Sequence, residues 1–189
     1  DTSDIFYGSA DIALNIKDSE DRVRLDLISQ GKDGMGMEVK NVTFNGSEVS
    51  YSHDNDVLLI ETGTLEYSSR DIINVVYSGM PITGLIIGPN MHGDRTFFSD
   101  NWPNKARNWL PLVDHPYDKS TAEFIVIAPN HYQVISNGLL VEETNLNKEL
   151  KKTHWKQSIP ISCWLYALGV AEFAVDYVDY FEGKSIQTW

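Results

Sequence analysis

The feature that most constrains this chain is an alternation of apolar and polar residues in two runs within its first eighty positions. Apolar side chains recur at every second residue over 10–16 and again over 23–27. A period of two is typical of a β-strand with one buried face, whereas an amphipathic helix repeats every 3.6 residues. The alternation therefore predicts strands and excludes a helical fold for this half of the chain.

Turn signals separate further short apolar runs along the rest of the sequence. Asn45-Gly46 and Asn137-Gly138 are the pairs that tight β-hairpins favour. We expect strands at 10–16, 23–27, 37–44, 47–53, 57–62, 71–79, 122–128, 132–136, 139–143 and 148–157, and one or two more within 164–178. Many short strands with little helix predict an all-β fold, a mostly antiparallel multi-sheet β-sandwich.

One stretch, from about residue 88 to 121, breaks this alternation. Structureless loops of more than roughly a dozen residues are uncommon in a compact domain and are usually functional or disordered. Disordered segments are poor in aromatic residues, but this one contains Phe97, Phe98, Trp102 and Trp109. We therefore expect an ordered functional loop, with a single helical turn over 103–108.

The net charge of the chain limits which binding partners it can have. The 189 residues carry a formal net charge of -12, and a strongly negative field repels nucleic acid and anionic membrane surfaces. We expect neither partner, and no apolar run reaches the roughly 18 residues of a membrane span. The one cysteine, Cys163, lies in an apolar run, which predicts a buried side chain. A single cysteine cannot form an internal disulfide, so the cysteine content leaves cytoplasmic, periplasmic and secreted locations open.

The loop contains residues that could bind a metal ion. His92 and Asp94 lie near its start, and Asp114, His115 and Asp118 lie near its end. The chain has neither an HExxH nor a C-x-x-C motif. Asp-His-Pro also favours a turn in which the Asp side chain bonds the backbone two residues later. We prefer the turn and expect no metal and no cofactor on this chain.

The sequence gives little support for a hydrolase active site within the chain itself. Glycoside hydrolysis needs two carboxylates roughly 5 to 10 Å apart in a cleft, and a chain this acidic contains carboxylate pairs by chance. The G-x-S-x-G motif of serine hydrolases is absent from the sequence. We therefore expect no catalytic residue among the 189.

Two arginines, Arg95 and Arg107, lie among the aromatic residues of the loop. An arginine fork in an ordered loop usually pairs with a carboxylate, and Asp100, Asp114 and Asp118 are nearby in sequence. We expect Arg95, Arg107 and Asp114 to have a structural role in this loop; direct contact with a substrate is the alternative.

The loop and the strand that follows it also resemble a known family. The stretch RTFFSDNWPNKARNWLPLVDHPYDK, followed by AEFIVIAP, is similar to the amino-terminal domain of zinc aminopeptidases of the aminopeptidase N and leukotriene hydrolase family (gluzincins). The residues at matching spacings are Ala106-Arg107, Pro111, Asp114 and Pro116. The run WLYALGVAEF also looks like the family's pattern, so the resemblance covers nearly the whole chain.

The resemblance implies one amino-terminal, saddle-like β domain over residues 1–189 of a larger peptidase. In that family the zinc, the HExxH helix and its downstream Glu belong to a second, thermolysin-like domain. This chain would then wall the cleft in which amino-terminal residues are removed from peptides. Its partners would be its own catalytic domain and peptide substrates.

The same resemblance singles out Asp100, Asn101 and Trp102 as substrate-binding residues. Many family members have Glu or Gln where this chain has Trp102, and that residue helps to hold the free amino group of the substrate. An indole N–H cannot accept a hydrogen bond, although the ring face attracts a cation. Asp100 or Asn101 is then the candidate acceptor.

Two other functions remain open at this stage. The chain could be a stand-alone ligand- or carbohydrate-binding β-sandwich that uses Trp102, Trp109 and Tyr117 as an exposed aromatic surface. It could also be a small hydrolase with paired carboxylates. A free-standing binding module would bind its ligand alone, whereas a severed domain would expose an apolar patch where its partner belongs.

Overall fold

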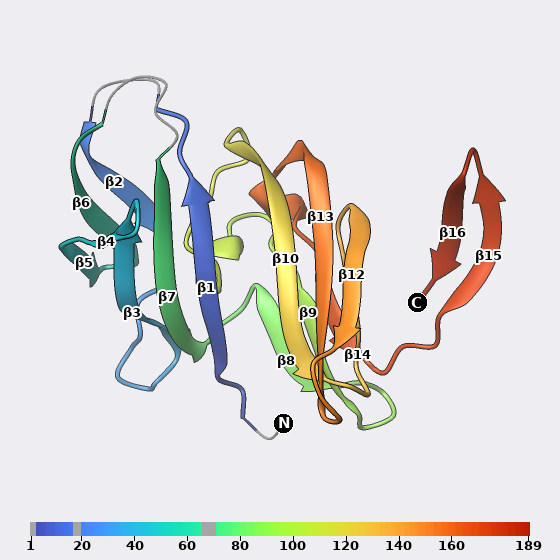
Figure 1. Ribbon diagram of the computed structural model, residues 1–189. Coiled ribbons are helices and arrows are strands. Elements are labelled where there is room, and N and C mark those ends of the chain that lie inside the picture. Colours follow the sequence, from blue (N-terminus) through green and yellow to red (C-terminus); the bar gives the residue numbers. More distant parts are fainter. Residues whose placement is uncertain (1–2, 17–19, 66–70) are drawn as a thin grey trace. The chain divides into compact units, whose positions relative to one another are not determined.

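The computed structural model describes residues 3–16, 20–65 and 71–189. Strands contain 62% of the residues and helices 3%, in several mostly antiparallel sheets (Figure 1). The predicted all-β, sandwich-like class is confirmed.

The elements are short and follow one another closely. The strands are β1 (Phe6–Ala13), β2 (Glu20–Asp26), β3 (Gly36–Phe44), β4 (Ser47–Glu48), β5 (Tyr51–Asp54), β6 (Val57–Leu65), β7 (Ile72–Met80), β8 (Leu85–Pro89), β9 (Arg95–Ser99), β10 (Lys119–Pro129), β11 (Gln133–Ser136), β12 (Leu139–Asn145), β13 (Leu150–Ser162), β14 (Leu168–Ala171), β15 (Asp176–Phe181) and β16 (Lys184–Thr188). The 3-10 turns are η1 (Ala106–Asn108) and η2 (Cys163–Leu165).

The chain divides into two compact units. The first contains residues 1–86, 99–120 and 160–166, and the second contains 87–98, 121–159 and 167–189. The long loop after β9 therefore belongs to the first unit. The prediction of one domain over 1–189 stays a prediction.

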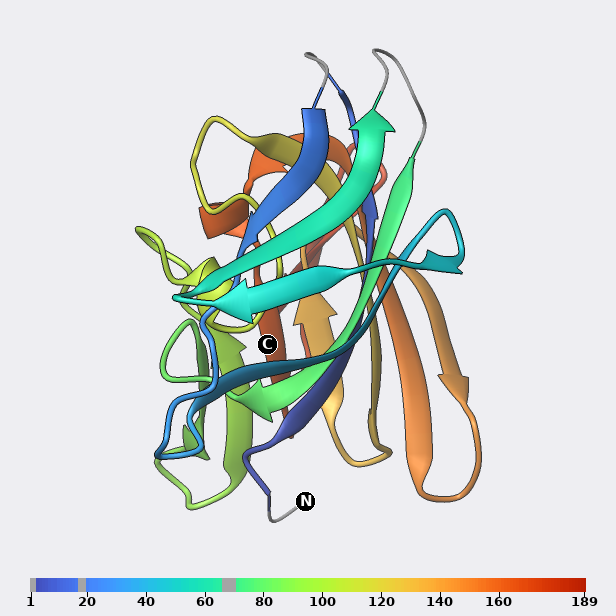
Figure 2. The ribbon, with the colours of Figure 1, turned by 90° about the vertical axis from the view of Figure 1, so that its left-hand side faces the viewer.

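Two antiparallel sheets build the first unit, in the orders β1-β7-β3-β4 and β2-β6-β5 (Figures 1 and 2). Alternate side chains of β1 are half-buried and exposed, as the period of two predicts. Each sheet buries one apolar face. The buried side chains include Leu25, Val42, Leu58, Ile60, Ile73 and Val75.

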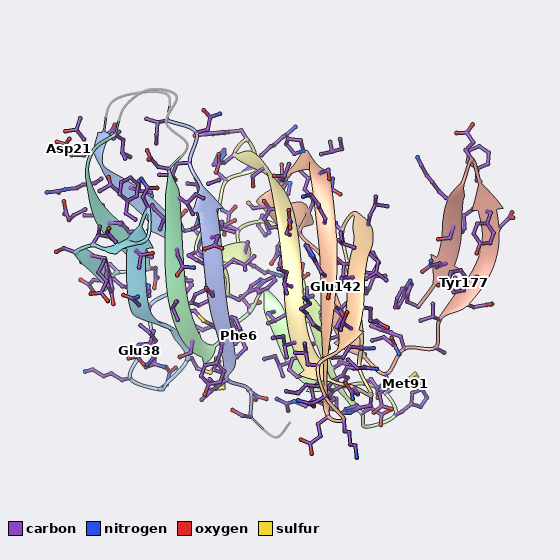
Figure 3. The ribbon with its side chains drawn as sticks, viewed as in Figure 1. Phe6, Asp21, Glu38, Met91, Glu142 and Tyr177 are labelled. Atoms are coloured by element: carbon purple, nitrogen blue, oxygen red, sulfur yellow. The ribbon has the colours of Figure 1, made fainter. Side chains whose placement is uncertain are left out.

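The second unit contains the sheets β10-β13-β12 and β11-β14-β9-β8 and the hairpin β15–β16. Its core cluster is Ala128, Tyr132, Val134, Trp155 and Val170. The indole of Trp155 donates a hydrogen bond to the carbonyl of Val134, 2.9 Å away, so its one polar atom is satisfied. Figure 3 shows Met91 at the turn between β8 and β9 and Tyr177 on β15.

Most predicted strands are present, but one expectation was wrong. Residues 95–99 were assigned to the loop and form β9, whose Phe97 and Phe98 pair with Val170 and Gly169 of β14. The strands expected within 164–178 are β14 and the start of β15, and η2 precedes them. The hairpin signals were right: Gly46 and Gly138 have φ of 81° and 87°, and a residue without a Cβ adopts such angles easily.

Two adjacent isoleucines of β7 provide a matched test of this packing. Ile73 is fully buried, whereas Ile72 is 47% exposed. We expect Ile73→Ala to lower the free energy of unfolding by about 2–5 kcal/mol, because it opens a cavity. Ile72→Ala should change it by roughly 0.5 kcal/mol. Urea unfolding of both variants measures the difference, and equal losses would contradict the assigned strand register.

Candidate functional site

The loop between β9 and β10 is held by a cluster of charged groups around Arg107. The Arg107 Nε lies 3.1 Å from Asp114 Oδ2, and a terminal guanidinium nitrogen lies 3.5 Å from Asp26 Oδ2. The Arg107 backbone N–H also donates to Asp114 Oδ2 at 3.2 Å. The Asp114 side chain is fully buried, and a buried carboxylate persists only when it is paired and hydrogen-bonded.

Asp26, the last residue of β2, also belongs to this cluster. Its Oδ2 accepts the Asp114 N–H at 3.0 Å. Its backbone N–H donates to the carbonyl of Leu112 at 2.7 Å. The loop is therefore attached to the β2 end by backbone and side-chain contacts together.

Cys163 also contacts the carboxylate of Asp114. Its Sγ lies 3.4 Å from Asp114 Oδ1. Burial, and then the hydrogen bond to the Asp114 carboxylate, raise the pKa of the Cys163 thiol to about 12. The thiolate is the nucleophilic form of cysteine, so Cys163 is an inert packing residue at neutral pH, as its apolar sequence context indicated.

The segment Asp100–Trp102 turns its middle residue inward. Asn101 is 2% exposed. Its Oδ1 accepts the indole N–H of Trp109 at 2.8 Å, and its Nδ2 donates to the carbonyl of Tyr166 at 2.7 Å. Sequence reasoning placed Asn101 beside a substrate, but its amide is engaged at both ends.

Asp100 and Trp102 are the exposed residues of this segment. Trp102 is 64% exposed, and the peptide bond between it and Pro103 is cis. The carboxylate of Asp100 pairs with Lys105 Nζ at 2.6 Å, with both side chains partly exposed. The backbone N–H of Asp100 donates to the carbonyl of Gly84 at 2.8 Å.

Gly84 is a supporting residue that the sequence analysis missed. Its φ is +78°, and a Cβ at this position would lie 2.2 Å from the carbonyl oxygen of Lys105. Any larger residue would therefore push the loop away from its present course. The signal in the sequence was the glycine of the turn before β8, but nothing local linked it to Lys105.

Together these contacts fix the backbone of the loop and leave the side chains of Asp100 and Trp102 exposed. The family scan matches residues 1–165 to the Peptidase M1 N-terminal domain. The chain belongs to the M1 peptidase N-terminal domain family. This confirms the resemblance drawn from Ala106-Arg107, Pro111, Asp114 and Pro116.

Curated relatives match shorter parts of this M1 domain. Rat glutamyl aminopeptidase is 32% identical over 75 residues, which is 40% of this chain and 8% of the relative. A leucyl aminopeptidase of Saccharolobus solfataricus is 24% identical over 144 residues, 75% of this chain and 18% of that protein. The chain thus spans less than a fifth of the length of either enzyme.

Solved structures of M1 zinc metallopeptidases share the fold. One from Deinococcus radiodurans has a TM-score of 0.79 at 20% identity and covers 96% of this chain and 41% of its own. A mutant of that enzyme bound to a Tyr-Ser-Ala substrate has a TM-score of 0.79 at 21% identity, covering 96% and 42%. A two-domain M1 zinc metallopeptidase mutant bound to L-tryptophan reaches 0.81 at 19% identity, covering 98% and 43%.

The histidine and aspartate residues considered for a metal do not fit zinc. Asp114 is engaged by Arg107 and Cys163, and the rings of His115 and Tyr117 are 4.0 Å apart. Over residues 3–16, 20–65 and 71–189 no three His, Cys, Asp or Glu residues form a group that could hold a metal ion. That this chain binds no metal stays a prediction.

The turn expected after Asp114 is present, because the N–H of Asp118 donates to the carbonyl of His115 at 3.1 Å, but the expected bond from the Asp114 side chain to the backbone two residues later is wrong. The residue two positions on is Pro116, which has no N–H to donate. Asp114 accepts from Arg107 instead. An Asn does form such a turn upstream, where Asn90 Oδ1 accepts the N–H groups of His92 and Asp94 at 2.8 and 2.9 Å.

Arg95 lies in β9, within the second unit. Its guanidinium carbon is 5.3 Å from the centre of the Phe97 ring, a distance at which a cation is attracted to an aromatic face. Arg107 and Asp114 pair directly, whereas Arg95 interacts with an aromatic ring of its own strand. A shared structural role for all three stays a prediction.

The buried ion pair allows a direct test of how the loop is held. We expect Asp114→Asn to lower the free energy of unfolding by about 2–4 kcal/mol, because it removes the charge that Arg107 and the buried N–H groups require. Asp118→Asn, an exposed carboxylate in the same loop, should have an effect of roughly 0.5 kcal/mol or less. Thermal unfolding compares them; equal effects would show that the pair does not stabilise the loop.

Proposed function

We propose that this M1 domain is the amino-terminal part of a zinc aminopeptidase, and that it forms one wall of the peptide-binding cleft. The observation that supports this most directly is the family match over residues 1–165. The catalytic domain would lie outside residues 1–189. The chain spans only 41–43% of the solved M1 metallopeptidases described above, which leaves ample length for such a domain.

The proposed reaction is the removal of amino-terminal residues from peptides. The relatives are a glutamyl and a leucyl aminopeptidase, and one structural neighbour was solved with the tripeptide Tyr-Ser-Ala. We infer peptides with a free amino end as the substrate class. The two relatives differ in the residue their names specify, so they do not define a preference for this protein.

Zinc would supply Lewis-acid chemistry from the catalytic domain. Among residues 3–16, 20–65 and 71–189 no group of His, Cys, Asp or Glu forms a suitable ligand set, and we assign none of these side chains to the metal or to proton transfer. The contribution of this domain would be to bind and orient the substrate and to limit water access to the cleft.

Asp100 and Trp102 are the residues we propose to face the substrate. The exposed Trp102 ring can attract an ammonium group through its π-face or contact the first side chain. The Asp100 carboxylate can accept hydrogen bonds from the same ammonium. Its present partner, Lys105, is held only by a partly exposed ion pair, and such pairs contribute roughly 0–1 kcal/mol. A substrate amine could therefore replace Lys105.

Arg107 and Asp114 would act behind this surface as a structural clamp, and Arg95 would stabilise the strand that leads into the loop. The same loop was also considered as the ligand surface of a stand-alone binding module. That hypothesis needed Trp109 at the surface, but Trp109 is 3% exposed. Of its three aromatic residues only Trp102 and Tyr117 are accessible.

The test uses the longer protein in which residues 1–189 precede the catalytic domain, with amino-acid 4-nitroanilides as substrates. We expect hydrolysis that a zinc chelator abolishes. We also expect Trp102→Ala to raise KM about 5-fold or more, because it removes a contact to the bound amine or first side chain. Tyr117→Ala, which removes another exposed aromatic side chain of the loop (78% exposed), is the matched control and should stay within 2-fold, roughly 0.4 kcal/mol.

Hydrolysis that survives complete zinc removal would contradict the proposed reaction. Equal effects of the Trp102 and Tyr117 variants would contradict the proposed wall.

A further inference from the structure

Asn101 differs from both of its neighbours in the loop. Asp100 and Trp102 are exposed, whereas Asn101 is 2% exposed and directs its amide into the first unit. Its two hydrogen bonds reach Trp109, eight residues later and after η1, and Tyr166, 65 residues later and after η2. A single side chain therefore connects three parts of the chain.

The chemistry of the two partners specifies an amide at this position. The indole N–H of Trp109 can only donate, and the carbonyl of Tyr166 can only accept. An Asn side chain supplies one acceptor and one donor in fixed positions without a charge. An ionised Asp would keep the acceptor but present an oxygen to the Tyr166 carbonyl, and Ala would remove both hydrogen bonds.

The backbone around Asn101 is fixed as well. Its carbonyl accepts the N–H of Lys105 at 3.0 Å, and the N–H of the preceding residue donates to Gly84 at 2.8 Å. Ser99 Oγ donates to the same Tyr166 carbonyl at 3.1 Å. On the far side, the Tyr77 hydroxyl donates to the carbonyl of Trp109 at 2.8 Å.

These bonds determine where the side chains on either side of Asn101 point. They fix the backbone on both sides of the buried Asn101, and the Asp100 and Trp102 side chains project from this fixed backbone to the surface. Asp100 forms a partly exposed ion pair with Lys105, and Trp102 is 64% exposed. The geometry of this exposed pair therefore depends on the buried amide between them.

We propose that Asn101 is a positioning residue for substrate binding: it holds Asp100 and Trp102 in the orientation that receives the amino end of a peptide. This inference rests on the proposed function. It replaces the expectation that Asn101 itself contacts the substrate. Misplacement of binding groups by about 1 Å can change enzyme kinetics by up to roughly 100-fold, so a residue that never touches the substrate can still affect its binding.

The experiment compares Asn101→Asp with Asn104→Ala in the longer protein. Asn104 is an exposed residue of the same loop and is the matched control. We expect Asn101→Asp to raise KM for leucine 4-nitroanilide about 10-fold while kcat stays within 2-fold, the pattern of lost uniform binding. The inhibition constant of free leucine should rise in parallel.

Acetohydroxamate is the probe that separates positioning from general damage. It binds zinc but has no amino group, so its inhibition constant should not change in Asn101→Asp. Hydrogen exchange on residues 1–189 gives an independent measurement. We expect the Lys105 amide, which donates to the Asn101 carbonyl, to exchange at least about 10-fold faster in the variant.

A second variant covers the case in which Asn101→Asp fails to fold. Trp109→Phe keeps a buried aromatic ring but removes the indole N–H that donates to Asn101 Oδ1. It should likewise raise KM while kcat stays within 2-fold, with a smaller increase in KM. A KM within 2-fold of wild type in a folded variant, or equal loss of affinity for leucine and acetohydroxamate, would overturn the positioning role.

The failure of the proposed function has a different signature. If the wild-type longer protein cleaves no amino-acid 4-nitroanilide, the aminopeptidase assignment is overturned, and the positioning role with it. If wild type is active and Asn101→Asp behaves like Asn104→Ala, only the positioning role is overturned.

Discussion

The rest of the loop depends on the buried carboxylate of Asp114. It accepts from the side chain and the backbone N–H of Arg107, and its own N–H is held by Asp26. A buried charge without such partners would be strongly destabilising. The pairing therefore restricts the loop to one course, and that course brings Asn101 to Trp109 and Tyr166.

This arrangement separates structural residues from exposed ones within a few positions of sequence. Arg107, Asp114 and Asn101 use their polar atoms on other parts of the chain. Asp100 and Trp102 keep a carboxylate and an aromatic face at the surface. A domain that lacks a metal-ligand set in its described residues can still contribute to a metallopeptidase in this way, by presenting a rigid binding wall.

Local patterns in the sequence predicted the sheets well but predicted the loop only in part. Alternation identified β1 and β2 because the period of two depends only on neighbouring residues, and the two Asn-Gly pairs marked their hairpins. The strand β9 was missed, since Arg95, Thr96 and Phe97 are all half-buried and show no alternation. The resemblance to M1 peptidases came from motif spacing, which local burial does not alter.

The inward side of the loop could not be read from the sequence, because its partners are distant. Asp26 is 88 residues from Asp114, and Tyr166 is 65 residues from Asn101. Nothing in the order Asp100-Asn101-Trp102 indicates which residue is buried. The same limitation made Trp109 look like an exposed aromatic residue, when its indole N–H is bonded to Asn101 inside the first unit.

The most direct test of the central claim is a crystal structure of the longer protein with a bound amino acid such as leucine. The account predicts the ligand ammonium within about 6 Å of the Trp102 ring centre, the range of a cation–π contact, with the Asp100 carboxylate beside it. A ligand bound at the zinc with its ammonium directed away from residues 100–102 would contradict the account.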